Sequence, residues 1–384
     1  MKGRDRCLSA LMLEEPDTVP IFEIWIDTRV AEAILGRPTY YGGLLSRGWY
    51  ELTKAYARGR RDEAVQSFIR DQIAVHRKLG LDAICVWLTY PKRVDSVRFL
   101  GEGLYEERFG GLSFGLRHRY APQTENLALV PPYPVRTRKD LQAISEVELS
   151  EGSTDIVRRV AKEVGDEMLV IAHRDIIFNY YCFGLDHILR SFYVDPSFAS
   201  EALRVIANRE IEIAKTLLDE GAEVIIEGAD VAGKTGPFMT PKHFKEFILP
   251  NLRSAVQAVK KKGAFLIKHE DGNYYPILDD IVDSGVDAIH AIEPLAGMNI
   301  GVVKKRCGDR VCLCGNIDCA YTLVNKSQAD VIAEVAACID DASMGGGHIL
   351  SSSNTIHFGV KPENYLAMIR AARRYGRYPH ISEG

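Results

Sequence analysis

Residues 266–273, LIKHEDGN, place a histidine and two acids at the end of an apolar run. His269 and Asp271 are separated by one residue, so on an extended strand their side chains point to the same face. An imidazole and a carboxylate in this arrangement can bind a metal ion, and a catalytic zinc typically has three protein ligands and one open position. Glu227 or Asp230, which follow another apolar run, could complete the set. The alternative is a hydrogen-bonded cluster that holds a polar substrate.

The apolar runs that precede these residues recur along the chain. Most follow a glycine that ends a helical pattern, as in LGLDAICVWLTY, EGAEVIIEGAD and SGVDAIHAIEP. Their nearly continuous apolar character predicts strands that are buried on both faces, which is typical of parallel sheets. With residues 19–27 and 168–175 included, we count eight such strands, most of them separated by helical patterns. The sequence therefore predicts an α/β fold, a (β/α)8 TIM barrel, as a single domain over residues 1–384.

The active sites of such barrels lie at the C-terminal ends of the strands. In chain order, the residues expected there are Glu23 and Asp27; Trp87 and Thr89; His173, Arg174 and Asp175; Glu227 and Asp230; His269, Glu270 and Asp271; His290 and Glu293; Asn316 and Asp318; and Ser352, Asn354 and His357. Burying ionisable groups without partners costs free energy. These groups must therefore pair with one another, with a metal or with a ligand.

Residues 90–135 interrupt the alternation of strands and helices. They are rich in aromatic residues and glycine and contain short alternating stretches, as in RVDSVRFLGEGLYEERFGGLSFGLRHRY. This pattern predicts short antiparallel strands and hence an inserted β-rich flap after the second strand. We expect the flap over the mouth of the barrel, either in contact with a substrate or as a purely structural element.

Composition argues against several classes of protein. A net charge of −4 gives no basic footprint for nucleic acid, and no apolar run approaches the roughly 20 residues of a membrane helix. The N-terminal stretch MKGRDRCLSALMLEEPD lacks the apolar core of a secretory signal. Eight cysteines in such a chain indicate free thiols in a reducing cytoplasm. Cys312 and Cys314 fall within a predicted strand, where we expect them to pack in the interior.

Five stretches in the second half of the chain carry a family resemblance: GPFMTPKHFKEFILPNL, IKHEDGN, GVDAIHAIEPLAGMNI, GDRVCLCGNID and GGGHILSSSNTIHFGVKPENYLAMIRAA. Together they resemble the uroporphyrinogen decarboxylase superfamily, and the similarity extends back to about residue 6. The resemblance implies a (β/α)8 barrel and raises the possibility of a homodimer. The superfamily contains the decarboxylase of haem synthesis and cobamide-dependent methyltransferases, which move methyl groups between small molecules and corrinoid proteins.

Departures from the family's motifs distinguish between these branches. The decarboxylase has an N-terminal RQAGRY-like motif for its polycarboxylate substrate, whereas this chain reads PIFEIWIDTRVAEAILG, whose acids would repel one. The coenzyme M methyltransferases hold zinc with His-x-Cys and a distant cysteine. Here the matching residues are His269-Glu270-Asp271 and, near the distant position, Ser352 and Ser353. The chain is therefore most similar to the O-demethylase branch, and the resemblance implies zinc bound by His269, Glu227 and Asp271.

The same resemblance implies an enzyme that transfers a methyl group from a small methoxy or methylamine substrate to the cob(I)alamin of a separate corrinoid protein. A Lewis acid or proton donor at the leaving atom would assist this reaction. The expected catalytic residues are His269, Asp230, Asp318 and Asn316, and the expected substrate-binding residues are Trp25, Trp87, Arg174, Tyr181 and Asn354. Two alternatives remain open: a decarboxylase or lyase of the uroporphyrinogen decarboxylase type, and a non-catalytic barrel that binds a corrinoid or a partner.

Overall fold

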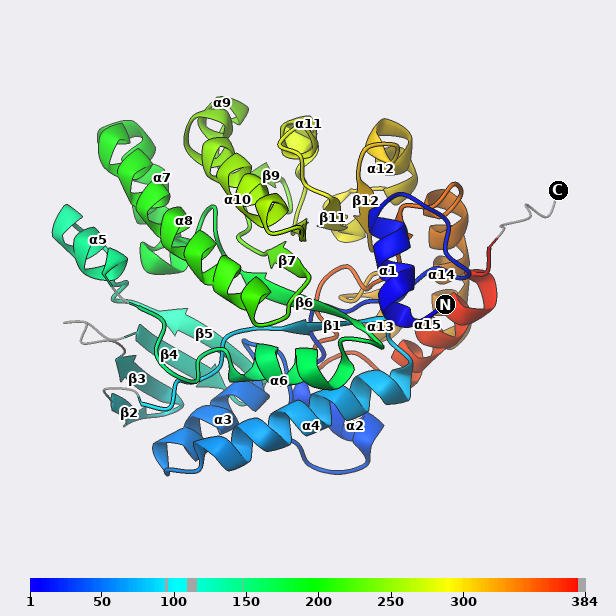
Figure 1. The fold of residues 1–384 in the computed structure, drawn as a ribbon, viewed down its shortest axis with the longest axis horizontal. Helices are drawn as coiled ribbons and strands as arrows, with labels where there is room; N and C mark the ends of the chain where they lie inside the picture. The colour runs from blue at the N-terminus through cyan, green and yellow to red at the C-terminus, as the bar shows by residue number, and fades with distance from the viewer. Residues whose placement is uncertain (94–95, 109–115, 147, 379–384) are drawn as a thin grey trace.

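Seven parallel strands form a curled sheet at the centre of the molecule (Figure 1). The computed structural model describes residues 1–93, 96–108, 116–146 and 148–378. In sheet order the strands are β1 (Ala83–Val86), β6 (Leu169–Arg174), β7 (Val224–Glu227), β10 (Phe265–Glu270), β11 (Ala288–Ala291), β12 (Cys312–Cys314) and β13 (His348–Ile349). Sheet order follows chain order, as in barrels of the TIM type. The α/β class and the parallel sheet predicted from the sequence are confirmed.

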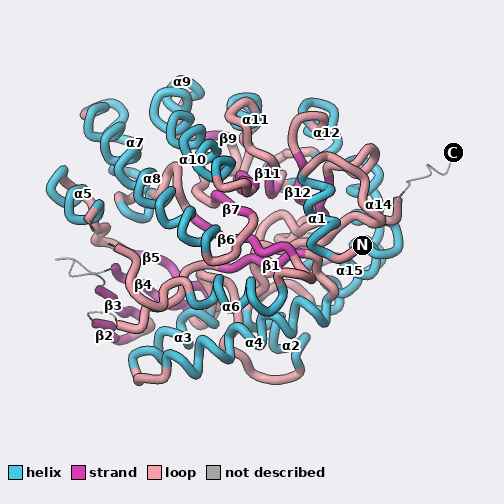
Figure 2. The backbone as a smooth tube through the Cα atoms, viewed as in Figure 1, coloured by secondary structure: helices cyan, strands magenta, loops and turns pink. Residues whose placement is uncertain are grey.

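Helices surround the sheet on its outer side (Figure 2). They are α1 (Gly3–Leu11), α2 (Thr28–Leu35), α3 (Arg47–Ala57), α4 (Arg61–Leu79), α5 (Arg138–Ser145), α6 (Asp155–Val164), α7 (Leu185–Val194), α8 (Pro196–Asp219), α9 (Pro241–His243), α10 (Leu249–Lys261), α11 (Leu278–Val282), α12 (Ile300–Cys307), α13 (Thr322–Asn325), α14 (Gln328–Ala342) and α15 (Pro362–Tyr375). Short turns of helix are η1 (Tyr180–Cys182), η2 (Phe244–Ile248), η3 (Tyr275–Ile277) and η4 (Pro294–Ala296). None of the helices in the described residues is both long and apolar enough to cross a bilayer.

The prediction of a strand over residues 19–27 is wrong. This segment makes only isolated parallel bridges with the chain after β13. Pro20 has no amide hydrogen to donate to a sheet, and the amide of Ile21 donates to Asp82 Oδ2 at 2.8 Å instead of to a backbone carbonyl. In return, the amide of Asp82 donates to the Ile21 carbonyl at 2.9 Å. The segment therefore lies between β13 and β1, where an eighth strand would close the barrel, without forming one.

A separate antiparallel sheet lies within residues 90–135. Its strands, in the order β2-β3-β4-β5, are β2 (Ser96–Gly101), β3 (Leu104–Arg108), β4 (Leu116–Ala121) and β5 (Asn126–Val130). Residues 94–95 and 109–115 of the expected flap lie outside the described residues. A small cluster of Tyr105, Tyr120 and Leu127 packs against Trp49 and Tyr50 of α3 and anchors this sheet. A further two-stranded hairpin, β8 (Ala232–Gly233) with β9 (Gly236–Pro237), follows β7.

The strands divide their side chains between two apolar clusters, as the two-residue period of a strand requires. Alternate residues, including Cys85, Ile171, Ile226, Ile267 and Cys312, form a compact cluster with residues of α1. The intervening residues pack outward in the large cluster shared with the helices. Cys312 and Cys314 both belong to the compact cluster and are buried, so the prediction that they are packing residues is confirmed. All eight cysteines are free thiols in this structure.

Candidate functional site

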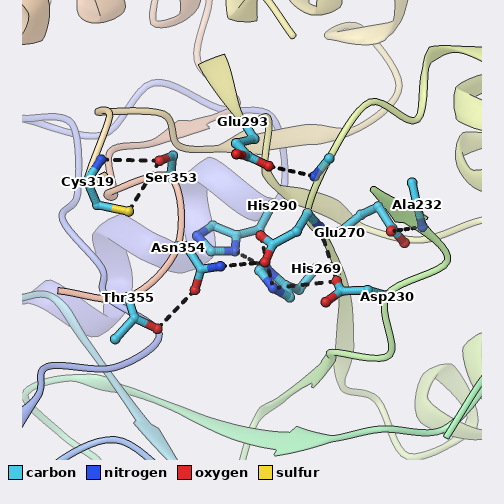
Figure 3. A network of polar contacts seen from close by, with 12 residues as sticks. Asp230, Ala232, His269, Glu270, His290, Glu293, Cys319, Ser353, Asn354 and Thr355 are labelled. Carbon is cyan, nitrogen blue, oxygen red and sulfur yellow. Dashed lines mark hydrogen bonds and ion pairs between the residues drawn. The ribbon is translucent and has the colours of Figure 1, made fainter. Parts of the chain in front are cut away.

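Asp230, His269 and Asp271 meet at the C-terminal ends of β7 and β10, as Figure 3 shows for the first two. One ligand atom from each residue can be chosen so that all lie within 4.8 Å of one another. His269 Nε2 is 3.6 Å from Asp271 Oδ1 and 3.9 Å from Asp230 Oδ1. Asp271 Oδ1 is buried and has no hydrogen-bond partner among the described residues. We call these three residues the His-Asp group.

The ring of His269 is oriented by a second histidine. His269 and His290 are register partners on β10 and β11, and their Nδ1 atoms are 2.7 Å apart. If His269 Nδ1 carries the proton and donates it to His290, His269 Nε2 presents its lone pair to the two acids. Burial, reinforced by nearby His290 and Lys268, lowers the pKa of His269 well below its usual value. His269 is therefore neutral, the state in which imidazole binds a metal.

A tight turn and two hydrogen bonds orient Asp271. Its amide donates to Asp230 Oδ1 at 3.1 Å, and Asn354 Nδ2 donates to its Oδ2. Gly272, which follows, has φ +81° and approaches Gly233 so closely that a Cβ there would lie 2.4 Å from the Gly233 carbonyl oxygen. Only glycine fits this turn. Burial raises the pKa of Asp271 well above its usual value, and the carboxylates of Asp230 and Glu293 add to the effect.

The His-Asp group fits a divalent cation. It combines a neutral imidazole with two crowded carboxylates, and one carboxylate oxygen is buried with no donor in the part of the chain that the structure describes. A cation would satisfy that oxygen and offset the repulsion between the acids. A mixed set of nitrogen and oxygen ligands is one that zinc accepts.

Glu227, predicted as the third ligand, is not part of this group. It is completely buried, and its Oε1 accepts hydrogen bonds from three backbone amides at 3.0 to 3.2 Å. Its Oε2 lies 3.0 Å from Lys268 Nζ. Glu227 thus fixes the loops around the strand ends, and in the geometry of the structure Asp230 stands where Glu227 was expected.

Lys268 is the residue that the sequence reasoning missed. Its side chain is wholly buried between Glu227 and Glu270, with Nζ 3.0 Å from a carboxylate oxygen of each. Burial alone would lower the pKa of Lys268, but the two carboxylates outweigh it and raise the pKa, so the lysine stays charged. Glu270 in turn accepts hydrogen bonds at 2.8 Å from the amides of Val231 and Ala232, next to Asp230. The sequence did contain a signal for this cluster, namely a lysine inside a strand that is predicted to be buried on both faces. Such a buried charge requires buried partners of opposite charge.

A cavity of about 590 Å³ opens beside the His-Asp group. Among the residues predicted to bind substrate, Trp25, Tyr181 and Asn354 line it. The other two, Trp87 and Arg174, line an adjacent cavity of about 350 Å³. Residues of the antiparallel sheet, among them His118 and Leu129, also line the larger cavity.

Two of the predicted catalytic residues, Asn316 and Asp318, form hydrogen bonds with nearby backbone groups of the protein. Asn316 Nδ2 donates to the carbonyl of Ile292 at 2.9 Å, and Asn316 is absent from the described lining of either cavity. Asp318 accepts hydrogen bonds from the amides of Ala320 and Tyr321 at 2.9 and 3.0 Å and so caps a turn. It lines a smaller space of about 280 Å³ that Asp271 also lines.

His173 and Asp175, at the end of β6, line both of the larger cavities and had no assigned role in the sequence prediction. His173 Nε2 is 3.6 Å from Asp175 Oδ1. Burial lowers the pKa of His173 to about 3 and raises that of Asp175 to about 6. Gly228 leaves room for this pair, since a Cβ there would lie 2.1 Å from His173 Nε2.

The curled parallel sheet, with its polar groups gathered at the strand ends, defines an α/β protein of the TIM-barrel type. Residues 114–375 match the family model of uroporphyrinogen decarboxylase (URO-D). The chain therefore belongs to the uroporphyrinogen decarboxylase family.

Comparisons with individual proteins agree with this assignment. The chain is 26% identical over 194 residues to uroporphyrinogen decarboxylase of Thioalkalivibrio sulfidiphilus, covering 48% of this chain and 51% of that protein. It is 23% identical over 265 residues to the Chlorobaculum tepidum enzyme, covering 64% and 72%. The chain thus spans about half the length of the first of these relatives. A methyltransferase from Methanosarcina mazei has the same fold, with a TM-score of 0.71 and 18% identity over 98% of this chain and 99% of that one.

Proposed function

We propose that the protein is a methyltransferase that moves a methyl group from a small methoxy or methylamine substrate to the cob(I)alamin of a separate corrinoid protein. The observation that carries the proposal is the His-Asp group at the edge of a cavity large enough for a small molecule. One oxygen of its Asp271 accepts no hydrogen bond from any residue that the structure describes. Family membership and the fold shared with a methyltransferase support it.

Zinc bound by Asp230, His269 and Asp271 would supply a Lewis acid at the leaving oxygen or nitrogen. Side chains of the protein orient the groups around that position. His290 keeps His269 in the orientation that directs Nε2 toward the acids, and Asn354 holds Asp271 Oδ2. Asp175 lines the same cavity, and its pKa of about 6 lets it carry a proton to the leaving atom near neutral pH. Trp25 and Tyr181 form part of a mainly apolar wall that limits water at the reacting atoms.

The charge of the cavity disfavours the decarboxylase alternative. Its described lining includes six acids, against the single guanidinium of Arg209: Asp27, Glu107, Asp175, Glu210, Asp230 and Asp271. A substrate with many carboxylates would be repelled there. A non-catalytic barrel remains distinguishable because its ligand binding would not depend on His269.

The metal content of the purified protein tests the proposal first. We expect about one zinc per chain, lost in His269→Ala. His357→Ala is the matched control, because His357 lines the same cavity outside the His-Asp group, and it should keep its metal. Incubation with methoxy and methylamine donors and free cob(I)alamin should then give methylcobalamin with wild type and not with His269→Ala. Absence of methyl transfer across the donor panel would sink the proposal, and carbon dioxide release from a porphyrinogen would favour the decarboxylase.

A further inference from the structure

The larger cavity spans the mouth of the barrel. Residues 19–27 lie between β13 and β1, so three strands separate them from β10 on either side: β1, β6 and β7 on one, and β11, β12 and β13 on the other. In a curled sheet of this kind the end of this segment therefore lies opposite β10. Trp25 and Asp27, near that end, line the same cavity as His269 and Asp271. A donor whose methyl group lies at the His-Asp group can extend toward them.

Asp27 is a buried carboxylate that forms no ion pair with any residue that the structure describes. It is 9% exposed, and the amide of Phe358 donates to its Oδ2 at 3.1 Å. Burial raises the pKa of Asp27 to about 7, and the nearby carboxylate of Glu125 adds to the rise. Backbone hydrogen bonds from Phe358 and Gly43 oppose it only in part. A buried carboxylate without a counter-charge favours the binding of a cation beside it.

The surroundings of Asp27 suit a cation with an organic body. Trp25 and Trp49 are half-buried and line the cavity, and the face of an indole ring attracts positive charge. Gly43 lines the cavity as well. A Cβ there would lie 3.0 Å from Asp27 Oδ1 and 3.2 Å from Trp25 Cβ. Glycine at this position therefore keeps a side chain from crowding the carboxylate and the ring.

The charge of the whole cavity favours a cation too. Six acids line it, against the guanidinium of Arg209. Two of the acids have partners: Glu210 accepts from that guanidinium at 2.8 Å, and Glu107 lies 2.6 Å from an imidazole nitrogen of β4. A zinc ion at the His-Asp group would balance two more. Asp175 acts in its protonated form in the proposed reaction, which leaves Asp27 as the carboxylate for a positively charged group of the donor.

We infer that the methyl donor carries a positively charged group, such as an ammonium, that binds beside Asp27 and the indole rings of Trp25 and Trp49. The inference rests on the proposed function in placing the reacting methyl group at the His-Asp group. Because zinc repels a cation, the positive charge lies away from the leaving atom, on the opposite side of the mouth. The class of substrate is thus a methoxy or methylamine compound with a separate cationic group.

Isothermal titration calorimetry of the purified protein, with zinc added, tests this subsite without a corrinoid acceptor. The probes are 4-methoxybenzylamine, which is cationic, 4-methoxybenzyl alcohol, a neutral analogue of nearly the same shape, and 4-methoxybenzoate, which is anionic. Wild type should bind the amine most tightly and the benzoate most weakly. Asp27→Asn, whose amide oxygen can still accept from Phe358, should weaken amine binding about tenfold or more and leave alcohol binding unchanged. Asp186→Asn, 87% exposed on α7, controls for lost charge and should behave as wild type.

A proton signature separates charge pairing from a structural role. Asp27 is partly protonated near neutral pH and must lose its proton to pair with a cation. The affinity for the amine should therefore rise between about pH 6 and 8. Amine binding should also release protons, measured as a binding heat that depends on the ionisation enthalpy of the buffer. The alcohol should show neither effect, and Asp27→Asn should reduce both for the amine.

The subsite is overturned if the amine binds no more tightly than the alcohol, or if Asp27→Asn weakens both probes equally. Trp49→Leu is a second variant, and it should reduce the preference for the amine because the cation loses an indole face. A preference unchanged in both variants also overturns the subsite. The two proposals fail separately. Methyl transfer from both probes without a preference for the amine would retain the methyltransferase and refute the subsite. An amine preference that depends on Asp27, with no methyl transfer from any donor, would do the reverse.

Discussion

The buried ion cluster of Lys268, Glu227 and Glu270 offers a sharp test of how the site is supported. Lys268→Met keeps the length and the apolar stem of the side chain but removes its charge. The two carboxylates would then remain buried without a cation, although backbone amides still donate to Oε1 of each. Because Glu270 holds the amides beside Asp230, the variant should also bind zinc more weakly than wild type.

Removing one partner of a buried ion pair costs about 3–5 kcal/mol. Unfolding entropy of about 2.1 cal/mol/K per residue, over 384 residues, amounts to about 0.8 kcal/mol/K. Lys268→Met should therefore lower the thermal midpoint by about 4–6 °C. Lys262→Met is the matched control. Lys262 contacts both oxygens of Asp219 at 2.7 and 2.8 Å, but the two side chains are 35% and 63% exposed. Such surface pairs contribute about 0–1 kcal/mol, or about 1 °C here.

Differential scanning calorimetry of wild type and both variants, at one pH and in the presence of a chelator, measures this difference. A Lys268→Met midpoint within about 1 °C of wild type, equal to the control, would refute the reasoning that a charged lysine holds these carboxylates. Equal loss in both variants would do so as well, since burial would then make no difference.

Three further predictions concern the acids and histidines. Asp271→Asn removes a carboxylate crowded by Asp230 and Glu293, so thermal scans should show a higher midpoint without metal and no further rise when zinc is added. His290→Phe removes the partner of His269 Nδ1 and should weaken zinc binding about 10–100-fold in a competition titration. Burial raises the pKa of Glu23 to about 8, above the value of about 4.3 for a free glutamate. The stabilisation from this group is complete below about pH 4 and lost as the pH rises through about 8. Glu23→Gln should therefore flatten the fall of the thermal midpoint across that range.

The sequence predicted the parts of the fold that depend on local pattern. Six of the seven strands were identified as apolar runs that follow a glycine, and β6 was identified as a further apolar run. The polar residues at the ends of these strands do gather at one edge of the sheet. Residues 19–27 have the same apolar pattern but are not a strand. The reason is a tertiary contact, since Asp82, distant in sequence, takes the amide of Ile21 through its side chain. No periodicity within the segment could indicate that contact.

The set of acids that lies near His269 was predictable only in part for a similar reason. Glu227 and Asp230 both follow the same apolar run, so spacing alone could not decide between them. The decision depends on Lys268, which lies opposite Glu227 in the register of β10 and β7 and pairs with it. Once Glu227 is committed to that lysine and to three amides, Asp230 is the acid of this strand end that stands near His269.

Asp271 stands at the position where the resemblance implies a sulfur ligand in thiol-activating methyltransferases. Asp271 follows the last residue of β10 and is turned back by Gly272, which brings its free oxygen within 3.6 Å of His269 Nε2. Carboxylate oxygens donate less electron density to a cation than thiolates, so a zinc ion held by Asp230, His269 and Asp271 would keep more of its charge. A more positive ion polarises an oxygen or nitrogen leaving group more strongly, whereas a thiolate-rich set suits the binding of a thiol. The replacement of sulfur by oxygen therefore supports a methoxy or methylamine donor over a thiol acceptor.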